Sequence, residues 1–159
     1  MTLLEKNSDT ILSLKIPVAY IDVRVFAHAT EDLDKVLTAA RNILPPEQAD
    51  TIVFKKSGLT GHHGNPIVLL EARIKDKKTA KTTLEKIASN LTMLDKEQLG
   101  NDIVQHLEKG NLYLRLDKQS LFQGDFRLSP TDAVHLRIHF KKHTLEEIVE
   151  ACRTFGLLP

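Results

Sequence analysis

Residues 57–73 read Ser-Gly-Leu-Thr-Gly-His-His-Gly-Asn-Pro-Ile-Val-Leu-Leu-Glu-Ala-Arg. The first part of this stretch holds three glycines, an Asn-Pro pair and two adjacent histidines, a composition typical of a tight turn or a ligand loop. The second part, from Ile67, is rich in aliphatic residues and predicts a strand. The stretch therefore indicates a β-containing fold with a polar loop at the end of one strand.

Alternation of apolar and polar residues predicts four strands, because successive side chains of a strand point to opposite faces. The four strands are expected at residues 18–28, 67–75, 111–118 and 133–141. A further short strand is expected at 51–55, and residues 58–66 are expected to form a connection. Each of the four alternating strands has one apolar face to bury and one polar face to expose.

Helical spacing of apolar residues predicts the remaining elements. We expect helices at 31–44, with Thr30 as the N-cap, at 76–91, at 95–108, and from the capping box that begins at Thr144 to Gly156. A loop is expected at 119–130. These elements predict an α+β fold: a single domain at 17–159 with an open, mostly antiparallel sheet and helices packed on one face, preceded by a partly ordered lead-in at 1–16.

The size and composition of the chain are those of one globular domain. It has 159 residues, of which 42% are hydrophobic and 27% charged, and these values exclude disordered and fibrous classes. Because 22 Lys and Arg residues stand against 21 Asp and Glu residues, the net charge is close to zero. A polyanionic partner would therefore need a local basic patch.

The single cysteine, Cys152, excludes an intramolecular disulfide and indicates a reducing compartment. No apolar run approaches the ~20 residues that cross a bilayer, and the first residues lack the pattern of a signal peptide. We therefore expect a cytoplasmic protein with no membrane partner.

One arginine falls on the outward face of each alternating strand: Arg24, Arg73, Arg115 and Arg137. If the strands form one sheet, these arginines share its exposed face with Tyr20, Tyr113, Lys75, His135, His139 and Lys141. Guanidinium groups bind phosphates and tyrosine rings stack on bases, so such a face suits single-stranded or irregular RNA. The alternative is an ordinary solvated face whose arginines pair across strands with Asp22, Glu71 and Asp117.

The adjacent histidines His62 and His63 are candidate metal ligands. However, neighbouring histidines usually point apart, and neither a CxxC pair nor an HExxH helix completes a site. Two other interpretations remain, a polar turn or a turn whose amides and imidazoles hold a phosphate. The chain also lacks a nucleophile elbow and a phosphate-binding P-loop. We therefore expect no enzyme, no metal and no cofactor.

Three segments resemble those of a family of small archaeal proteins described as RNA-binding proteins or predicted exosome subunits. They are Gly61–Ile67, Leu112–Gln119 with Gly124 soon after, and Asp132–Ile138. The resemblance implies a fold similar to that of the ribosomal protein that binds the smallest ribosomal RNA, homodimer formation and a link to exosome subunits. It also implies that the loop and the residues from Arg115 to Gln119 are neighbours in space.

We therefore expect an RNA-binding accessory factor in RNA processing or degradation. The residues expected to contact RNA are Arg24, Arg73, Arg115, Arg137, His62, His63, Lys118, Gln119, Tyr113, His135, His139 and Lys141. The main alternative is a non-catalytic assembly or adaptor protein whose sheet face binds a protein or a second copy. A metal-dependent phosphoesterase that uses His62 and His63 is a third hypothesis.

Overall fold

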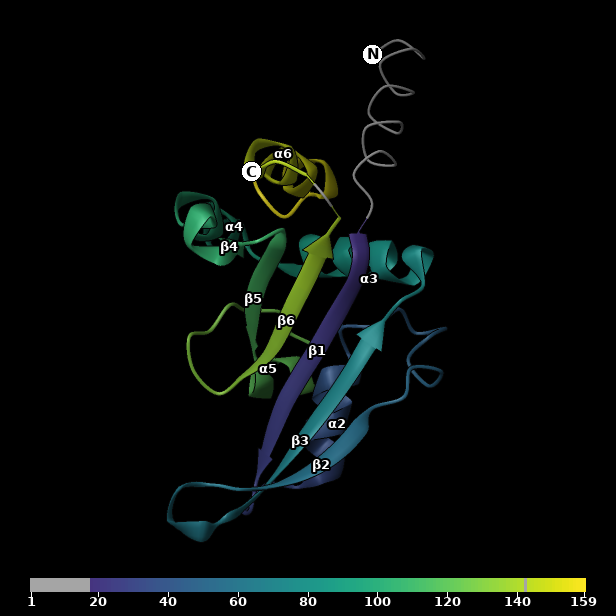
Figure 1. Ribbon diagram of the computed structural model, residues 1–159, viewed down its shortest axis with the longest axis vertical. Helices are drawn as coiled ribbons and strands as arrows, with labels where there is room; N and C mark the ends of the chain where they lie inside the picture. The colour runs from purple at the N-terminus through teal and green to yellow at the C-terminus, as the bar shows by residue number, and fades with distance from the viewer. Residues whose placement is uncertain (1–17, 142) are drawn as a thin grey trace.

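The computed structural model describes residues 18–141 and 143–159, with the backbone but not the side chain of His62. The lead-in expected at 1–16 lies outside these residues. The described chain forms one α+β domain around a six-stranded sheet in the order β2-β3-β1-β6-β5-β4 (Figure 1). All neighbouring strands are antiparallel. The predicted class, an open antiparallel sheet with helices, is confirmed.

Four of the six strands are those that alternation predicted. The strands are β1 (Val18–His28), β2 (Lys55–Thr60), β3 (Pro66–Ile74), β4 (Leu107–Glu108), β5 (Asn111–Asp117) and β6 (Ala133–Phe140). The short strand predicted at 51–55 is wrong, because the chain turns there and the strand runs from Lys55 to Thr60. This strand forms a hairpin with β3 at the edge of the sheet, where its side chains are mostly exposed. It therefore lacks the apolar alternation that marks a half-buried strand.

Five helices complete the fold: α2 (Leu33–Arg41), α3 (Lys77–Asn90), α4 (Met93–Asn101), α5 (Lys118–Phe122) and α6 (Leu145–Phe155). Two short 3₁₀ turns, η1 (His62–Gly64) and η2 (Ile103–His106), lie between them. The predicted cap of α3 at Asp76 and the capping box of α6 are confirmed.

Three details of the helix prediction are wrong. Asp32, not Thr30, caps α2, because its carboxylate accepts from the backbone N–H of Asp34. The helix expected at 95–108 ends at Asn101, and the chain continues as η2 and β4, where Val104 is exposed. The loop expected at 119–130 begins as α5, since the Asp117 carboxylate caps a short helix there.

The core lies on one side of the sheet. The inward residues of β1, Ile21, Val23 and Val25, are fully buried, and Figure 1 shows α2 and α3 behind the sheet with α4 and α6 beyond its upper end. The near face of the sheet is left without a covering helix among the described residues.

No helix among the residues that the structure describes is long and apolar enough to span a bilayer.

Candidate nucleic-acid interface

Strand register brings the four predicted arginines onto the uncovered face in two neighbouring rows. The first, which we call the Asp22 row, crosses β3, β1, β6 and β5 as Arg73, Asp22, Arg137 and Tyr113. The second, the His135 row, crosses the same strands as Glu71, Arg24, His135 and Arg115. The predicted placement of the arginines on one face is therefore what the structure has.

The Asp22 row is held together by one carboxylate between two guanidinium groups. Arg73 donates to both oxygens of Asp22, with Nε–Oδ1 of 2.7 Å and Nη2–Oδ2 of 3.0 Å, and Arg137 donates to Oδ2. Burial would raise the pKa of Asp22, but the hydrogen bonds from the two arginines outweigh burial and lower it. The same contacts raise the pKa of Arg73 and Arg137. Asp22 is therefore ionised and fixes both guanidinium groups.

A stack of planar groups continues from this row. The Arg73 guanidinium lies 4.0 Å from the centre of the Tyr20 ring, and that ring stacks on His139 with centroids 4.9 Å apart. His139 Nδ1 lies 2.7 Å from Oδ1 of Asn111, which can only accept, so Nδ1 carries the proton. Planar groups of this kind are the ones on which nucleobases stack.

The His135 row has a different arrangement of charge. Arg24 pairs with Glu71 at 3.3 Å, and both side chains are largely exposed. Arg115 donates to the carbonyl of Pro130 at 3.3 Å and forms no ion pair with a carboxylate among the described residues. His135 lies between these two arginines. Burial, and after it the positive charges of Arg115 and Arg24, lower the pKa of His135. Its imidazole is therefore neutral near pH 7.

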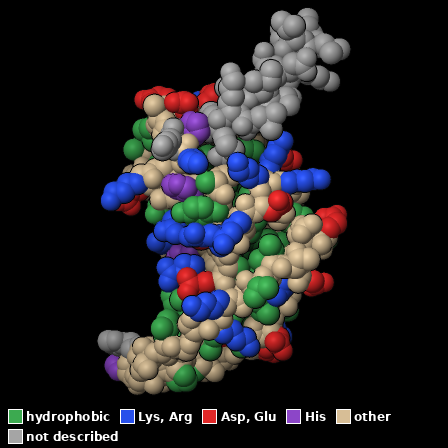
Figure 2. Space-filling view, turned by 45° about the vertical axis from the view of Figure 1, so that its right-hand side comes forward, with side chains coloured by type: hydrophobic (Ala, Val, Ile, Leu, Met, Phe, Trp, Pro, Cys, Tyr) green, Lys and Arg blue, Asp and Glu red, His purple; other side chains and the backbone are tan. Residues whose placement is uncertain are grey.

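Both rows form the floor of a hollow of about 1230 Å³. Val53 and Lys55 contribute to its lining from the segment that leads into β2, and Gln105 and Glu108 from η2 and β4. The lining contains six Lys and Arg residues against three Asp and Glu residues. Figure 2 shows Lys and Arg side chains gathered across the middle of this face, with few Asp and Glu side chains among them.

The predicted loop residues lie away from the hollow. The turn between β2 and β3 projects from the lower end of the molecule (Figure 1) and is closed by a hydrogen bond from Gly61 N to Asn65 O at 2.7 Å. His63 is exposed there with a left-handed φ of 63°. The side chain of His62 lies outside the described residues, and Lys141 is exposed in the bend after β6.

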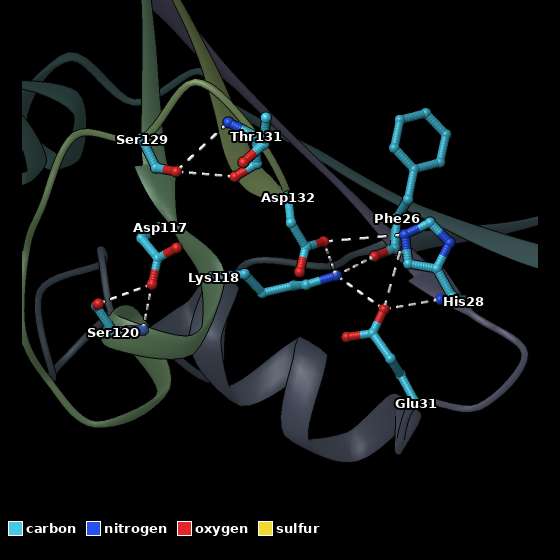
Figure 3. A network of polar contacts seen from close by, with 9 residues as sticks. All are labelled: Phe26, His28, Glu31, Asp117, Lys118, Ser120, Ser129, Thr131 and Asp132. Atoms are coloured by element: carbon cyan, nitrogen blue, oxygen red, sulfur yellow. Dashed lines mark hydrogen bonds and ion pairs between the residues drawn. The ribbon is translucent and has the colours of Figure 1, made fainter.

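Lys118, predicted to face RNA, is almost fully buried instead. Its ammonium donates to Glu31 at 2.8 Å and to the carbonyl of Phe26 at 2.9 Å, and pairs with Asp132 at 2.8 Å (Figure 3). This network joins the end of β1, the start of α2 and the start of β6. Together with His28, the two carboxylates could surround a cation, and the Lys118 ammonium lies among them.

Two segments that were expected to be neighbours, the β2–β3 turn and residues 115–119, lie apart. The carboxylate of Asp117 accepts from the N–H and hydroxyl of Ser120, its own helix cap (Figure 3). Figure 1 shows α5, which carries the exposed Gln119, well away from the β2–β3 turn. The expectation that these segments adjoin is therefore wrong. Asp117 caps α5, and the ammonium of Lys118 bonds groups far from it in the sequence.

Several residues of the face and the network were not predicted. Val53, Lys55, Gln105 and Glu108 border the hollow because of the β2 hairpin and the η2 turn, the two elements that alternation did not detect. One feature of the sequence could have indicated the hairpin: a polar segment lies directly before a Gly-rich turn and a predicted strand. Glu31 and Asp132 carry no local signal, since their partner is distant in sequence.

The fold and this face define a small α+β protein with an open, arginine-lined sheet. The chain belongs to a protein family described as RNA binding, whose model matches residues 20–140. RNA-binding protein PAB1135 from Pyrococcus abyssi is 33% identical over 144 residues, which cover 87% of this chain and 94% of that protein.

Solved structures share the architecture. Mth689, a DUF54 protein from Methanothermobacter thermautotrophicus, aligns with a TM-score of 0.71 at 26% identity, covering 90% of this chain and 99% of that one. Protein AF2318 from Archaeoglobus fulgidus, also of the DUF54 family, aligns with a TM-score of 0.74 at 22% identity, covering 87% and 99%. The second likeness shows the fold alone.

Proposed function

We propose that this protein binds RNA through the hollow on the uncovered face of its sheet. The observation that carries the proposal is the local excess of cations: six Lys and Arg against three Asp and Glu line the hollow, whereas the whole chain has a net charge of +1. An excess of cations in a concave site attracts a phosphate backbone more strongly than the same charges spread over a surface. Membership in a family described as RNA binding supports the same conclusion.

The chemistry of the face favours RNA with unpaired bases. Tyr113 is 38% exposed and lies beside Arg137, and the stack of Arg73, Tyr20 and His139 presents further planar groups. Such rings bind bases that are free to unstack, as in single strands, loops and bulges. The substrate class we propose is therefore single-stranded or irregular RNA.

The biological role we propose is that of a non-catalytic accessory factor in RNA processing or degradation. The name of the Pyrococcus relative supports binding rather than cleavage. Burial raises the pKa of the Cys152 thiol to about 12, so this group is not available as a nucleophile. Exosome subunits as partners, a homodimer and a fold like that of the ribosomal protein belong to this proposal through the family resemblance. A cytoplasmic location belongs to it through the single cysteine and the lack of an apolar run long enough to cross a bilayer.

The test is a fluorescence-anisotropy titration with a structured RNA and a single-stranded RNA at two salt concentrations. Arg115→Glu is expected to weaken binding by at least about tenfold and to reduce the salt dependence. The matched control is Lys81→Glu, which makes the same charge change on α3, behind the sheet. We expect the control to stay within about twofold of the parent, because only local charge attracts the phosphates.

A second candidate, an adaptor whose face binds protein, is favoured by one observation. Asp22 and Glu71 already pair with three of the four arginines, as in a surface that is neutralised internally. If Arg115→Glu changes the oligomeric mass in light scattering, and neither RNA binds the parent protein at low salt, the adaptor function replaces the RNA-binding one.

A further inference from the structure

The two rows of the face differ at their centre, although both have a pair of arginines. In the Asp22 row the group between the arginines is a carboxylate, which bonds to both guanidinium groups and offsets one of their two positive charges. In the His135 row the group between Arg24 and Arg115 is an imidazole. Residues directly opposite each other on neighbouring strands have Cβ atoms about 5 Å apart, so these three side chains form one cluster. Among the described residues no carboxylate joins Arg24 to Arg115, since Glu71 pairs with Arg24 alone.

We propose that Arg24, His135 and Arg115 form a seat for one phosphate group of RNA, and that His135 takes up a proton from solvent when the phosphate binds. This inference rests on the proposed function and deepens it by assigning a site and a pH dependence. A phosphate here would do for the His135 row what Asp22 does for its neighbour.

The donors of the seat fit this ligand. Among the described residues, Arg115 is engaged only by a backbone carbonyl at 3.3 Å, and Arg24 by an exposed carboxylate at 3.3 Å, so both guanidinium groups can turn toward a phosphate without breaking a buried bond. All three side chains line the hollow. Guanidinium groups and a protonated imidazole offer only donors, which matches the acceptor oxygens of a phosphate.

The uptake of a proton by His135 follows from its surroundings. The charged and titratable groups nearest to it in the strand register are Arg24 and Arg115 directly opposite, Asp22, Tyr113 and Asp117 diagonally on β1 and β5, and Arg137 on its own strand. Asp22 is already bonded to two arginines, and Asp117 to Ser120. Burial and, after it, the two opposite arginines keep the imidazole neutral, as its lowered pKa indicates. A bound phosphate offsets part of this positive charge and accepts a hydrogen bond, and both effects favour the imidazolium.

The sign of the pH dependence follows. Because His135 has a lower pKa in the free protein than in the complex, the affinity rises as the pH falls through the interval between the two values and is constant outside it. Uptake of one proton gives a change in Kd of up to about tenfold per pH unit within that interval. The upper limit of the interval lies above the ordinary histidine value of 6.5 if the phosphate more than compensates burial and the two arginines.

The experiment measures Kd by fluorescence anisotropy for a labelled oligouridylate of about eight nucleotides, from pH 5.5 to 8 at constant ionic strength. The parent protein should bind more tightly at low pH. His135→Gln keeps a hydrogen-bonding side chain but cannot take up the proton, so its Kd should not vary with pH and should equal that of the parent at the alkaline limit. His143→Gln, which changes an imidazole that pairs with Glu147 of α6 and does not line the hollow, should keep the slope of the parent.

Proton nuclear magnetic resonance of the His135 ring tests the seat without RNA. Replacing chloride by inorganic phosphate at equal ionic strength should raise the pKa of His135 and leave the resonances of His106, whose ring bonds the Tyr113 backbone on the far side of β5, in place. A parent protein that binds RNA with the same pH profile as His135→Gln refutes the seat and leaves the proposed function intact. Failure to bind RNA, with a His135 resonance that responds to phosphate, refutes the proposed function and supports the seat. A resonance that does not respond refutes the seat.

Discussion

Replacement of Lys118 by methionine separates a structural lysine from an RNA-binding one. The side chain is 5% exposed, and its three ammonium donors meet Glu31 at 2.8 Å, Asp132 at 2.8 Å and the Phe26 carbonyl at 2.9 Å. Methionine has a similar length and no charge, so Lys118→Met removes all three contacts while it preserves most of the packing. We expect the variant to lose stability and to keep the RNA affinity of its folded form.

The size of the loss follows from the exposure of each partner. The Glu31 carboxylate is 26% exposed, so its charge-assisted bond accounts for about 2 kcal/mol. The Asp132 carboxylate is 50% exposed, and its pair is reduced by solvent to about 0.5 kcal/mol. The carbonyl that loses its donor adds about 1 kcal/mol. The free energy of unfolding should fall by about 3.5 kcal/mol, which lowers the Tm of a domain of this size by about 7 to 14 °C.

Urea denaturation followed by circular dichroism measures the loss, and anisotropy at a temperature where both proteins are folded measures the RNA affinity. The control is Lys81→Met on α3, an exposed site at which we expect a change within about 0.5 kcal/mol. A destabilisation below about 1 kcal/mol would show that the network contributes little. A stable variant with weakened RNA binding would return Lys118 to the RNA-contacting set and refute the reasoning.

Three further predictions concern separate parts of the fold. Asp22→Asn should bind RNA more tightly and with a steeper salt dependence, because it releases two arginines, and should cost about 1 kcal/mol of stability. Because the folded pKa of Asp22 is lowered, its stabilising effect in the parent is present above pH ~4 and is lost as the pH falls through that lowered pKa. Urea denaturation from pH 5 to 2 should therefore show a smaller decline of the free energy of unfolding in Asp22→Asn than in the parent. Cys152, whose pKa burial raises to about 12, should react with thiol reagents only at the rate of global unfolding, which mass spectrometry measures. Gly110→Ala should destabilise by at least about 1 kcal/mol in thermal unfolding, because at φ 80° its Cβ would lie 2.9 Å from the Phe140 carbonyl oxygen.

The sequence predicts the face well because a strand has a period of two. Once alternation assigns β1, β3, β5 and β6, the side of the sheet on which each arginine lies follows without knowledge of the strand order. The order itself, and therefore the pairing of Arg73 and Arg137 through Asp22, depends on which strands become neighbours. Local pattern cannot supply that, because it is decided by the packing of the whole domain.

Two features escaped prediction for other physical reasons. β2 is exposed on both sides, so no hydrophobic period marks it, and its existence depends on hydrogen bonds to β3. Lys118 does not belong to the outward-facing residues of β5 or of α5. The strand ends at Asp117, and the helix turns the next side chain into the domain. A lysine is rarely buried without partners, and here the partners lie 87 and 14 residues away in the sequence.

The two rows also explain how a protein of net charge +1 can present a surface for RNA. Asp22 removes part of the positive charge, but it holds two guanidinium groups in place, one of them against the Tyr20 ring, before any ligand arrives. Side chains that are already ordered lose less conformational entropy on binding. In the His135 row, Glu71 pairs with Arg24, and the Arg115 guanidinium has no carboxylate partner among the described residues. The Asp22 row would thus provide rigid planar groups for bases, and the His135 row would provide the uncompensated charge for a phosphate. This division predicts that Asp22→Asn and Arg115→Glu have opposite effects on RNA affinity, and effects of the same sign would contradict it.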